Sequence, residues 1–229
     1  MAARTGATPT DGGLRLQLDA PVRGRDGMLG ELADLVVDPL RGRVTHLVVR
    51  PRRGESVSAR LVPLELAIAG DTHDGVSLDC ARRDFGALDP VGEVVAVAPG
   101  DPRVDDPNWD VGVADVMVPP LSTTSEFGVA GFPDEVTMIY DRVPKDDVEL
   151  RRSSSVESCD GHDLGHLEAL VVDANARLTG VVISHRRLWA RHNVLLPFHA
   201  IKEIRTDLVT VALTKREVKQ LPVEPARSA

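Results

Sequence analysis

Short apolar runs separated by turn residues are the main pattern along the chain. Leu29 to Val37 alternates imperfectly and ends in a fully apolar run, and Val44 to Val49 follows after a turn at residues 38–42. Runs of this length, bounded by turn residues, predict antiparallel β-strands. Several such strands at intervals of about 8–12 residues are typical of a sandwich or a small barrel. A unit of about ninety residues or fewer favours the barrel, because closure removes exposed sheet edges.

The same pattern occurs twice in the chain. The turn Asp26-Gly27 followed by Gly30 recurs as Asp160-Gly161 followed by Gly165, with one residue inserted. Asp-Gly pairs favour turns because glycine accepts positive φ and aspartate hydrogen-bonds its own backbone. The later landmarks keep the same order and nearly constant spacing, which indicates an internal repeat. They are an aspartate after an apolar run (Asp38, Asp173), a threonine that opens the next run (Thr45, Thr179), a proline after apolar residues (Pro63, Pro197) and a charged helical turn (81–88, 214–221).

These landmarks resemble those of the PRC-barrel family. The family is named after the H subunit of the photosynthetic reaction centre and also occurs in a ribosome maturation factor. The features that carry the resemblance are the Asp-Gly-x-x-Gly turn, the apolar strand that ends in aspartate, the run from Thr45 to Val49, and the run from Asn193 to Pro197 in the second copy. The resemblance implies an all-β fold of two small antiparallel PRC-type barrels, each with a short C-terminal helix, joined by an acidic linker.

Five segments are expected from this organisation. Residues 1–13 are small and polar and should form a disordered N-terminus, and residues 14–90 should form the first barrel. Residues 91–134 read as an extended, mobile acidic linker, although 91–98 could be a strand and 109–118 could hold a short element. Alternation resumes at Glu135 to Asp141, so the second barrel is expected at 135–223 and a tail at 224–229.

Charge is distributed unevenly along the chain. The formal net charge is −8, and residues 91–150 carry 13 acidic against 3 basic residues, whereas residues 151–229 carry 9 against 12. The middle of the chain therefore produces the acidic balance. Aromatic residues make up only 3% of the chain, so Val, Leu, Ile and Ala must build the cores.

The location expected from the sequence is cytoplasmic. The first thirteen residues have no apolar segment of the signal-peptide kind, and the longest apolar runs, of about five residues, are too short to span a membrane. Cys80 and Cys159 could pair with each other, but two thiols without metal-like spacing fit a reducing compartment better.

The recurring aspartates Asp26, Asp38, Asp160 and Asp173 could be mistaken for the paired carboxylates of an acid–base mechanism. Each borders a glycine or ends a strand where a turn must form, so a turn role explains all four. The serines at 153–155 have no His/Asp partner pattern that would make one a nucleophile. We therefore predict that the protein is not an enzyme and uses no cofactor. The residues assigned to structural turns are Asp26, Gly27, Gly30, Asp160, Gly161 and Gly165.

Histidines are concentrated in the second copy, which holds five of the seven: His162, His166, His185, His192 and His199. Histidine is the commonest ligand of transition metals, so His162 and His166 are weak candidates for a metal site. The spacing matches no known ligand motif and no cysteine pair accompanies it, so no metal is predicted.

Basic residues follow the central apolar run of each copy. Arg52-Arg53 and Arg186-Arg187 are 134 residues apart and are expected in equivalent loops, and Arg191 follows the second pair. Solvated loop charge is the simplest interpretation. Docking on the acidic middle segment, or recognition of an anionic partner through bidentate contacts, are the two others. Nucleic acid is disfavoured, because the chain is acidic and its seven aromatic residues show no stacking arrangement.

The predicted function is that of a protein-interaction or scaffold module in a bacterial, cytoplasmic setting. The resemblance implies this function, since PRC barrels serve as docking units within larger assemblies. The partner would be a protein, with an acidic surface if the arginines recognise it. Three alternatives stay open: an RNA- or ribosome-assembly factor, a subunit associated with a photosynthetic or electron-transfer complex, and metal or small-ligand binding in the second barrel.

Overall fold

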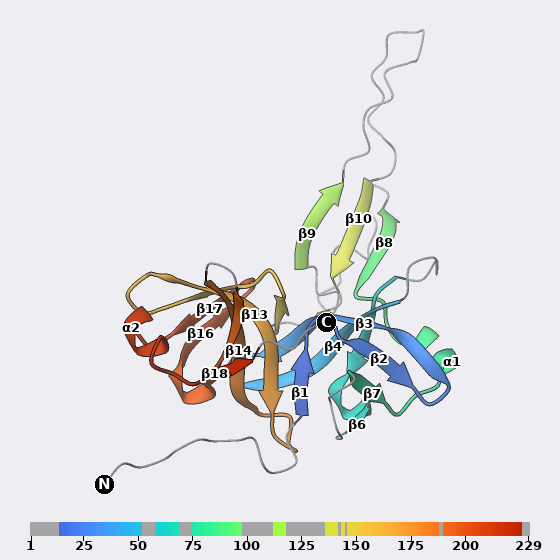
Figure 1. Ribbon diagram of the computed structural model, residues 1–229. Coiled ribbons are helices and arrows are strands. Elements are labelled where there is room, and N and C mark those ends of the chain that lie inside the picture. The colour runs from blue at the N-terminus through green and yellow to red at the C-terminus, as the bar shows by residue number, and fades with distance from the viewer. Residues whose placement is uncertain are drawn as a thin grey trace, which may run out of the picture.

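The protein is all-β, as predicted. The structure, a computed structural model, describes residues 14–51, 58–68, 75–97, 112–117, 136–141, 143–144, 146–187 and 190–225. Within these residues the strands form two large sheets and one small sheet, and the helices are short (Figure 1). The N-terminus expected to be disordered, residues 1–13, lies outside the described residues.

The first large sheet is built mainly from the first copy of the repeat. Its strands are β2 (Pro21–Gly24), β3 (Gly27–Asp38), β4 (Arg43–Pro51), β5 (Arg60–Pro63), β6 (Ala67–Ile68), β7 (Val76–Leu78) and β11 (Val148–Arg151). Their order is β5-β4-β3-β2-β7-β6, with β11 paired to β3. The short helices η1 (Leu64–Leu66) and α1 (Arg82–Gly86) follow β5 and β7. Pro63 ends β5, where its missing N–H costs no central ladder bond, as expected.

The second large sheet repeats this arrangement. Its strands are β1 (Leu14–Gln17), β12 (Ser155–Glu157), β13 (Asp163–Val172), β14 (Leu178–Arg187), β15 (Ala190–Pro197), β16 (Ile201–Arg205), β17 (Leu208–Val211) and β18 (Val223–Pro225). Their order is β16-β17-β12-β13-β14-β15-β18, with β1 paired to β13. Helices η4 (Phe198–Ala200) and α2 (Lys215–Val218) stand where η1 and α1 stand in the first copy. The tail expected from residue 224 begins inside β18, because this strand adds to β15 at the sheet edge.

Each large sheet takes one strand from the other half of the chain. β1 pairs antiparallel with β13 and places Leu16 opposite Leu170, while β11 pairs antiparallel with β3 and places Leu150 opposite Leu35. All four leucines are fully buried. The pairings cross the boundaries expected for the two barrels, because β1 was expected in the first unit and β11 in the second. Neither sheet is completed by its own copy of the repeat.

Two equivalent turns meet at the centre of this exchange. Val44 donates its N–H to the Ala176 carbonyl at 3.1 Å, and Leu178 donates its N–H to the Gly42 carbonyl at 2.9 Å. Between these bonds, the backbones of Arg43 and Arg177 form an isolated antiparallel bridge. The two donors, Val44 and Leu178, are 134 positions apart, which is the repeat spacing, and so are the two acceptors and the two bridge residues. The contacts are therefore reciprocal. They indicate an approximate two-fold axis between the two units.

One continuous hydrophobic core runs through both units. Inward-facing leucines and valines of β3, β4, β13 and β14 join those of β1 and β11 in a single cluster. A second cluster lies apart from this core. Val91 and Val143, on either side of the acidic segment, pack against it. Its members are Ala33, Val36, Val48 and Leu61. Aliphatic side chains thus form most of both clusters, as the low content of aromatic residues indicated.

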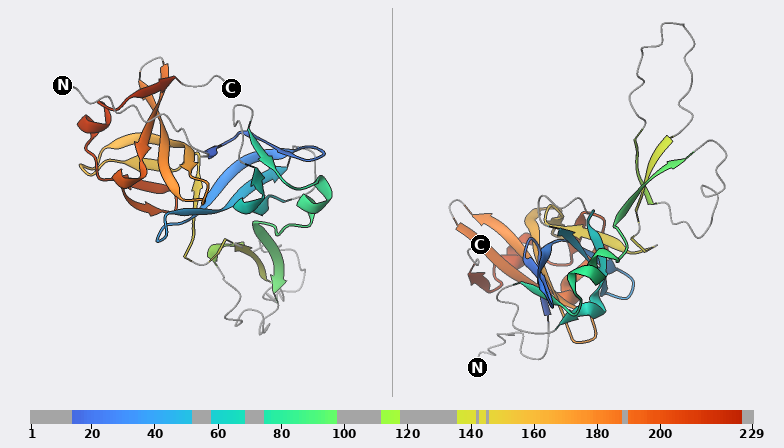
Figure 2. Two further views of the ribbon diagram at one scale, coloured as in Figure 1. Left: turned by 90° about the horizontal axis from the view of Figure 1, so that it is seen from below. Right: turned by 90° about the vertical axis from the view of Figure 1, so that its right-hand side faces the viewer.

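The acidic middle segment contains strands of its own. These are β8 (Gly92–Val97) and β9 (Gly112–Met117), which confirm the short elements considered there, and β10 (Val136–Asp141). β10 lies between β8 and β9 in a three-stranded sheet. The strand expected at 135–141 to open the second barrel therefore exists, but it pairs with the strands of the middle segment. Both views in Figure 2 show this small sheet projecting away from the large sheets.

Candidate functional site

The predicted basic residues of the second copy lie on the two paired strands of a hairpin. β14 continues through Arg187 and β15 begins at Ala190, so two residues connect the strands. Backbone ladder bonds do not require apolar side chains, which is why a polar stretch can prolong the strand beyond its apolar run. Arg186 is paired directly with Arg191, and His185 with His192. The structure describes the backbone of these residues and not their side chains.

The end of this hairpin continues beyond the residues that pair with β13. β13 pairs with β14 only as far as Ser184, which lies opposite His166. On the other side, β18 accompanies β15 from Val194 to His192. Positions 185–187 therefore have β15 as their one partner strand within the described residues. Like charges at directly opposite positions of a sheet are destabilising. The pairing of Arg186 with Arg191 therefore does not stabilise the hairpin, and its presence requires another reason.

The predicted basic residues of the first copy, Arg52 and Arg53, lie outside the described residues. The last described residues before them are Arg50 and Pro51 at the end of β4. Arg50 is exposed, and its guanidinium forms an ion pair with Glu31 on β3 at 3.1 Å. This part of the first copy is therefore a strand end with a neutralised arginine.

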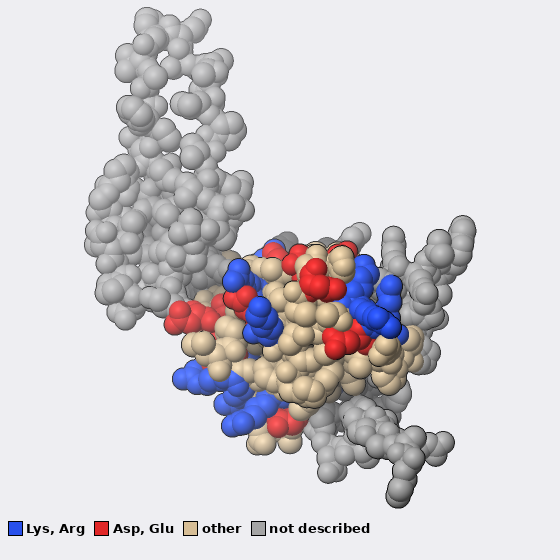
Figure 3. Space-filling view, turned by 90° about the vertical axis from the view of Figure 1, so that its left-hand side faces the viewer, with Lys and Arg blue, Asp and Glu red and all other residues tan. Residues whose placement is uncertain are grey.

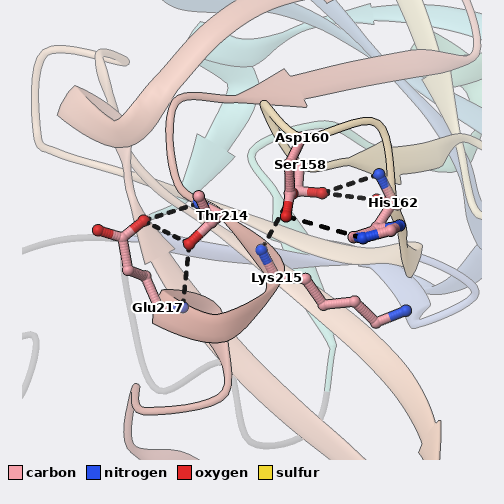
Figure 4. Close-up of polar contacts among 6 residues, drawn as sticks. All are labelled: Ser158, Asp160, His162, Thr214, Lys215 and Glu217. Carbon is pink, nitrogen blue, oxygen red and sulfur yellow. Dashed lines mark hydrogen bonds and ion pairs between the residues drawn. The ribbon is translucent and has the colours of Figure 1, made fainter.

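The Asp-Gly turns hold the short helices as well as reversing the chain. Asp26 accepts the backbone N–H of Arg82 at 2.9 Å, and Asp160 accepts that of Lys215 at 3.2 Å. Both donors are the first residues of their helices, whose N–H groups have no partner inside the helix. Figure 4 shows this contact beside the capping box of α2. The turn role that the sequence indicated is joined by a capping role that only the tertiary structure creates.

The glycines of these motifs divide into two kinds. Gly27 and Gly161 have φ of +132° and +72°, which favours glycine, as the turn prediction requires. Gly30 and Gly165 were assigned to the turns but lie inside β3 and β13, where the strand register shifts at a β-bulge. Gly165 also has a positive φ, of +120°. A Cβ on Gly30 would lie 2.1 Å from the Arg50 carbonyl oxygen, so glycine is needed there for the close approach of β4.

The two candidate histidines do not form a metal centre. The ring Nε2 of His162 is 3.8 Å from Asp160 Oδ2, and its backbone N–H donates to Ser158 Oγ at 3.0 Å (Figure 4). His166 is exposed on β13. In the described part of the chain, no group of three or more His, Cys, Asp or Glu side chains is placed to hold a metal ion. Cys80 and Cys159 are free thiols, one buried and one exposed, and do not pair.

Replacing Asp160 by Asn is expected to lower the midpoint of thermal unfolding. The hydroxyl of Ser158, and then the Lys215 N–H, lower the pKa of Asp160. Such a group stabilises the fold above its unfolded pKa, and the stabilisation is lost as the pH falls. Circular dichroism melts should therefore show the deficit of Asp160→Asn at about pH 7 and its progressive loss as the pH falls below about 4. Glu157→Gln, which changes an exposed carboxylate on β12, is the control; an Asp160→Asn deficit that persists unchanged in acid would contradict the charged cap.

A buried and a half-buried carboxylate come together where β11 enters the first sheet, a site that the sequence did not reveal. Glu149 is 8% exposed and forms an ion pair with Arg151, which lies opposite Asp34 of β3. Burial raises the pKa of Asp34 to about 6, and Glu149 adds to the rise. The signal available in the sequence was a single acid within the apolar run at 32–37.

A pocket of about 860 Å³ lies where β1, η1 and the turn at 173–177 meet. Its buried apolar lining comes from Leu14, Leu64 and Val172, and Arg43 and Arg177 also line it. This volume falls in the range of small-molecule sites. Neither Asp34 nor Glu149 lines this pocket. The raised pKa of Asp34 therefore does not mark an acid that faces the pocket.

Basic and acidic side chains are mixed on the side of the molecule that the second unit forms. Figure 3 shows Lys and Arg interspersed with Asp and Glu on this side. On β16 of the second unit, the exposed Arg205 and Glu203 form an ion pair with 2.7 Å between Nη2 and Oε1. The described residues of this face thus form no broad patch of one sign, which a surface that binds nucleic acid would require.

No protein-family model matches the chain, and no curated protein matches its sequence. None of the helices in the described residues is long and apolar enough to cross a membrane.

Proposed function

We propose that the protein is a tandem PRC-barrel protein that acts as a non-enzymatic, cytoplasmic interaction or scaffold module. The sequence landmarks of both copies support the family, and the matching strand orders of the two large sheets support two copies of one β unit. Closure of each sheet into a barrel is part of the proposal. Such closure would leave few free strand edges, so that recognition would fall to loops and projecting hairpins.

The observation that carries this proposal is the projecting end of the β14–β15 hairpin. Arg186 stands opposite Arg191, beyond Ser184, the last residue of β14 that pairs with β13. An anionic partner would offset the like charge of these two paired positions, and arginine binds carboxylates through two parallel hydrogen bonds. The partner that fits this arrangement is an acidic surface on another protein. Nucleic acid fits less well, because the chain carries a net charge of −8.

The combined substitution Arg186→Ser, Arg187→Ser and Arg191→Ser is expected to abolish capture of the partner. The tagged wild-type chain and the variant would be used to purify associated proteins from the native host, with mass spectrometry and a salt series as readouts. Loss of the arginines removes the charge-assisted contacts, and wild-type capture should weaken as salt rises. Adding Arg52→Ser and Arg53→Ser tests whether the first copy contributes.

The matched control replaces three exposed basic residues elsewhere in the second unit, Lys202, Arg216 and Lys219, with serine. It changes the net charge by the same amount and should retain the captured proteins. Thermal unfolding of both variants should match the wild type. If the hairpin variant captures the same proteins as the control, the hairpin is not the recognition surface; ribosomal RNA bound in a filter assay at low salt would favour the assembly-factor alternative.

A further inference from the structure

We propose that the pocket between the two copies is a binding site for a small carboxylate with an apolar chain. This site is separate from the β14–β15 hairpin and does not depend on the function proposed for it. Three observations support the site: one copy leaves open a space that the other copy fills, apolar side chains line part of the pocket wall, and two arginines meet at the same place.

The two copies differ in the side chains that occupy this place. Leu64 opens η1 and Phe198 opens η4, at positions 134 residues apart. The Phe198 ring lies against the backbone of Gly42, since a Cβ built on Gly42 would be 2.6 Å from the ring Cζ. The first copy has Leu64 at the position of this phenylalanine, and it has Ala67 at the position where the second copy has Ile201. Leu64 and Ala67 both line the pocket, so the two smaller side chains account for the open space.

The interior and the polar groups of the pocket fit a chain with a charged head. Leu14, Leu64 and Val172 are buried apolar residues of the main core. Arg43 and Arg177 are exposed and lie opposite each other in the bridge that joins the two turns. Among the described residues neither guanidinium has an ion-pair partner. A carboxylate between them would accept bidentate hydrogen bonds and relieve the repulsion of like charges.

Two acidic residues also line the pocket, and each has another role. Asp173 Oδ1 accepts the N–H groups of Asn175 at 2.8 Å and Arg177 at 3.0 Å, and these bonds close its turn. Glu65 is exposed and acts on His46: burial lowers the pKa of His46, and Asp147 and Glu65 oppose that change. The two guanidinium groups are therefore the polar groups best placed to receive a ligand.

Calorimetric titration of the full chain with octanoate tests the site. Octanoate should bind at least about tenfold more tightly than octanol, which has the same chain and no charge. Arg43→Gln with Arg177→Gln should remove that preference, whereas Arg205→Gln, an exposed arginine elsewhere, should leave it intact. Leu64→Phe copies the residue of the other copy and should fill the pocket, weakening octanoate binding by at least about tenfold. Ala67→Ile is a second filling variant, so that a folding defect in one variant leaves the test valid.

The outcomes separate this site from the hairpin. Octanoate binding that survives both filling variants, octanol binding as tight as octanoate, or no binding of octanoate at millimolar concentration would each overturn the pocket proposal. The triple serine variant of the hairpin should bind octanoate like the wild type. A loss of octanoate binding in that variant would likewise overturn the proposal of an independent site.

Discussion

Replacing Leu150 by alanine is expected to lower the free energy of unfolding by about 3–5 kcal/mol, through lost apolar transfer and the cavity left behind. Leu150 is fully buried opposite Leu35, in a strand that the second half of the chain supplies to the first sheet. A single core cluster contains residues of both sheets. The variant should therefore unfold in one transition, shifted to lower denaturant, and not through loss of the first unit alone.

Urea denaturation followed by circular dichroism would measure this loss, and amide hydrogen exchange would locate it. Exchange should become faster in β13 and β14 as well as in β3 and β4, because the exchanged strands couple the sheets. Leu16→Ala should produce a similar loss, since Leu16 occupies the equivalent place in the second sheet. Leu40→Ala is the control, because Leu40 is 90% exposed. Two separate transitions, or faster exchange confined to one sheet, would contradict the reciprocal exchange of β1 and β11.

Replacing Asp34 by asparagine is expected to stabilise the protein above neutral pH and to have little effect in acid. Burial, and then the charge of Glu149, raise the pKa of Asp34 from 3.8 to about 6. A group with a raised pKa contributes stability that is complete below its unfolded pKa and is lost as the pH rises through its folded pKa. Asparagine keeps a neutral side chain at every pH, so its advantage should appear as the wild-type carboxyl ionises. A pKa shift of this size sets an upper limit of about 3 kcal/mol, and solvent screening at this half-buried position reduces the expected gain below that limit.

The measurement is the difference in free energy of unfolding between Asp34→Asn and the wild type, at about pH 4 and about pH 8. The difference should be near zero at the lower pH and favour the variant at the higher one. Glu157→Gln, at an exposed position of β12, should show no comparable rise. A variant less stable than the wild type at the higher pH would mean that the ion pair between Glu149 and Arg151 requires the Asp34 charge.

Most of the local structure could be predicted from short-range patterns. The run from Leu29 to Val37, the turn at 38–42 and the proline at 63 became a strand, a turn and a strand end, because apolar runs, Asp-Gly pairs and prolines act over a few residues. The order of elements in both copies was visible for the same reason. Residues 185–187 were expected to follow the central strand, but they lie within β14, since backbone pairing between polar residues leaves no apolar run in the sequence.

The candidate sites were less accessible to sequence reasoning. Asp26 and Asp160 were recognised as turn residues, but their bonds to helix N-termini 56 and 55 residues later depend on how distant elements pack. The proximity of half-buried Asp34 and buried Glu149 was missed because the two acids come from different copies of the repeat. The pocket is likewise a product of packing, lined by β1, η1 and a turn from opposite halves of the chain.

The sequence by itself determined an all-β chain with a repeated order of strands and turns, because alternation and turn chemistry are read from neighbouring residues. The tertiary structure alone decided which sheet each strand joins. β1 and β11 carry apolar faces that suit either copy, since Leu16 and Leu150 are equivalent residues with equivalent partners. Two nearly identical partners cannot be told apart by local pattern. The choice depends on the reciprocal bonds at the two-fold axis and on the single core that forms when both strands are exchanged.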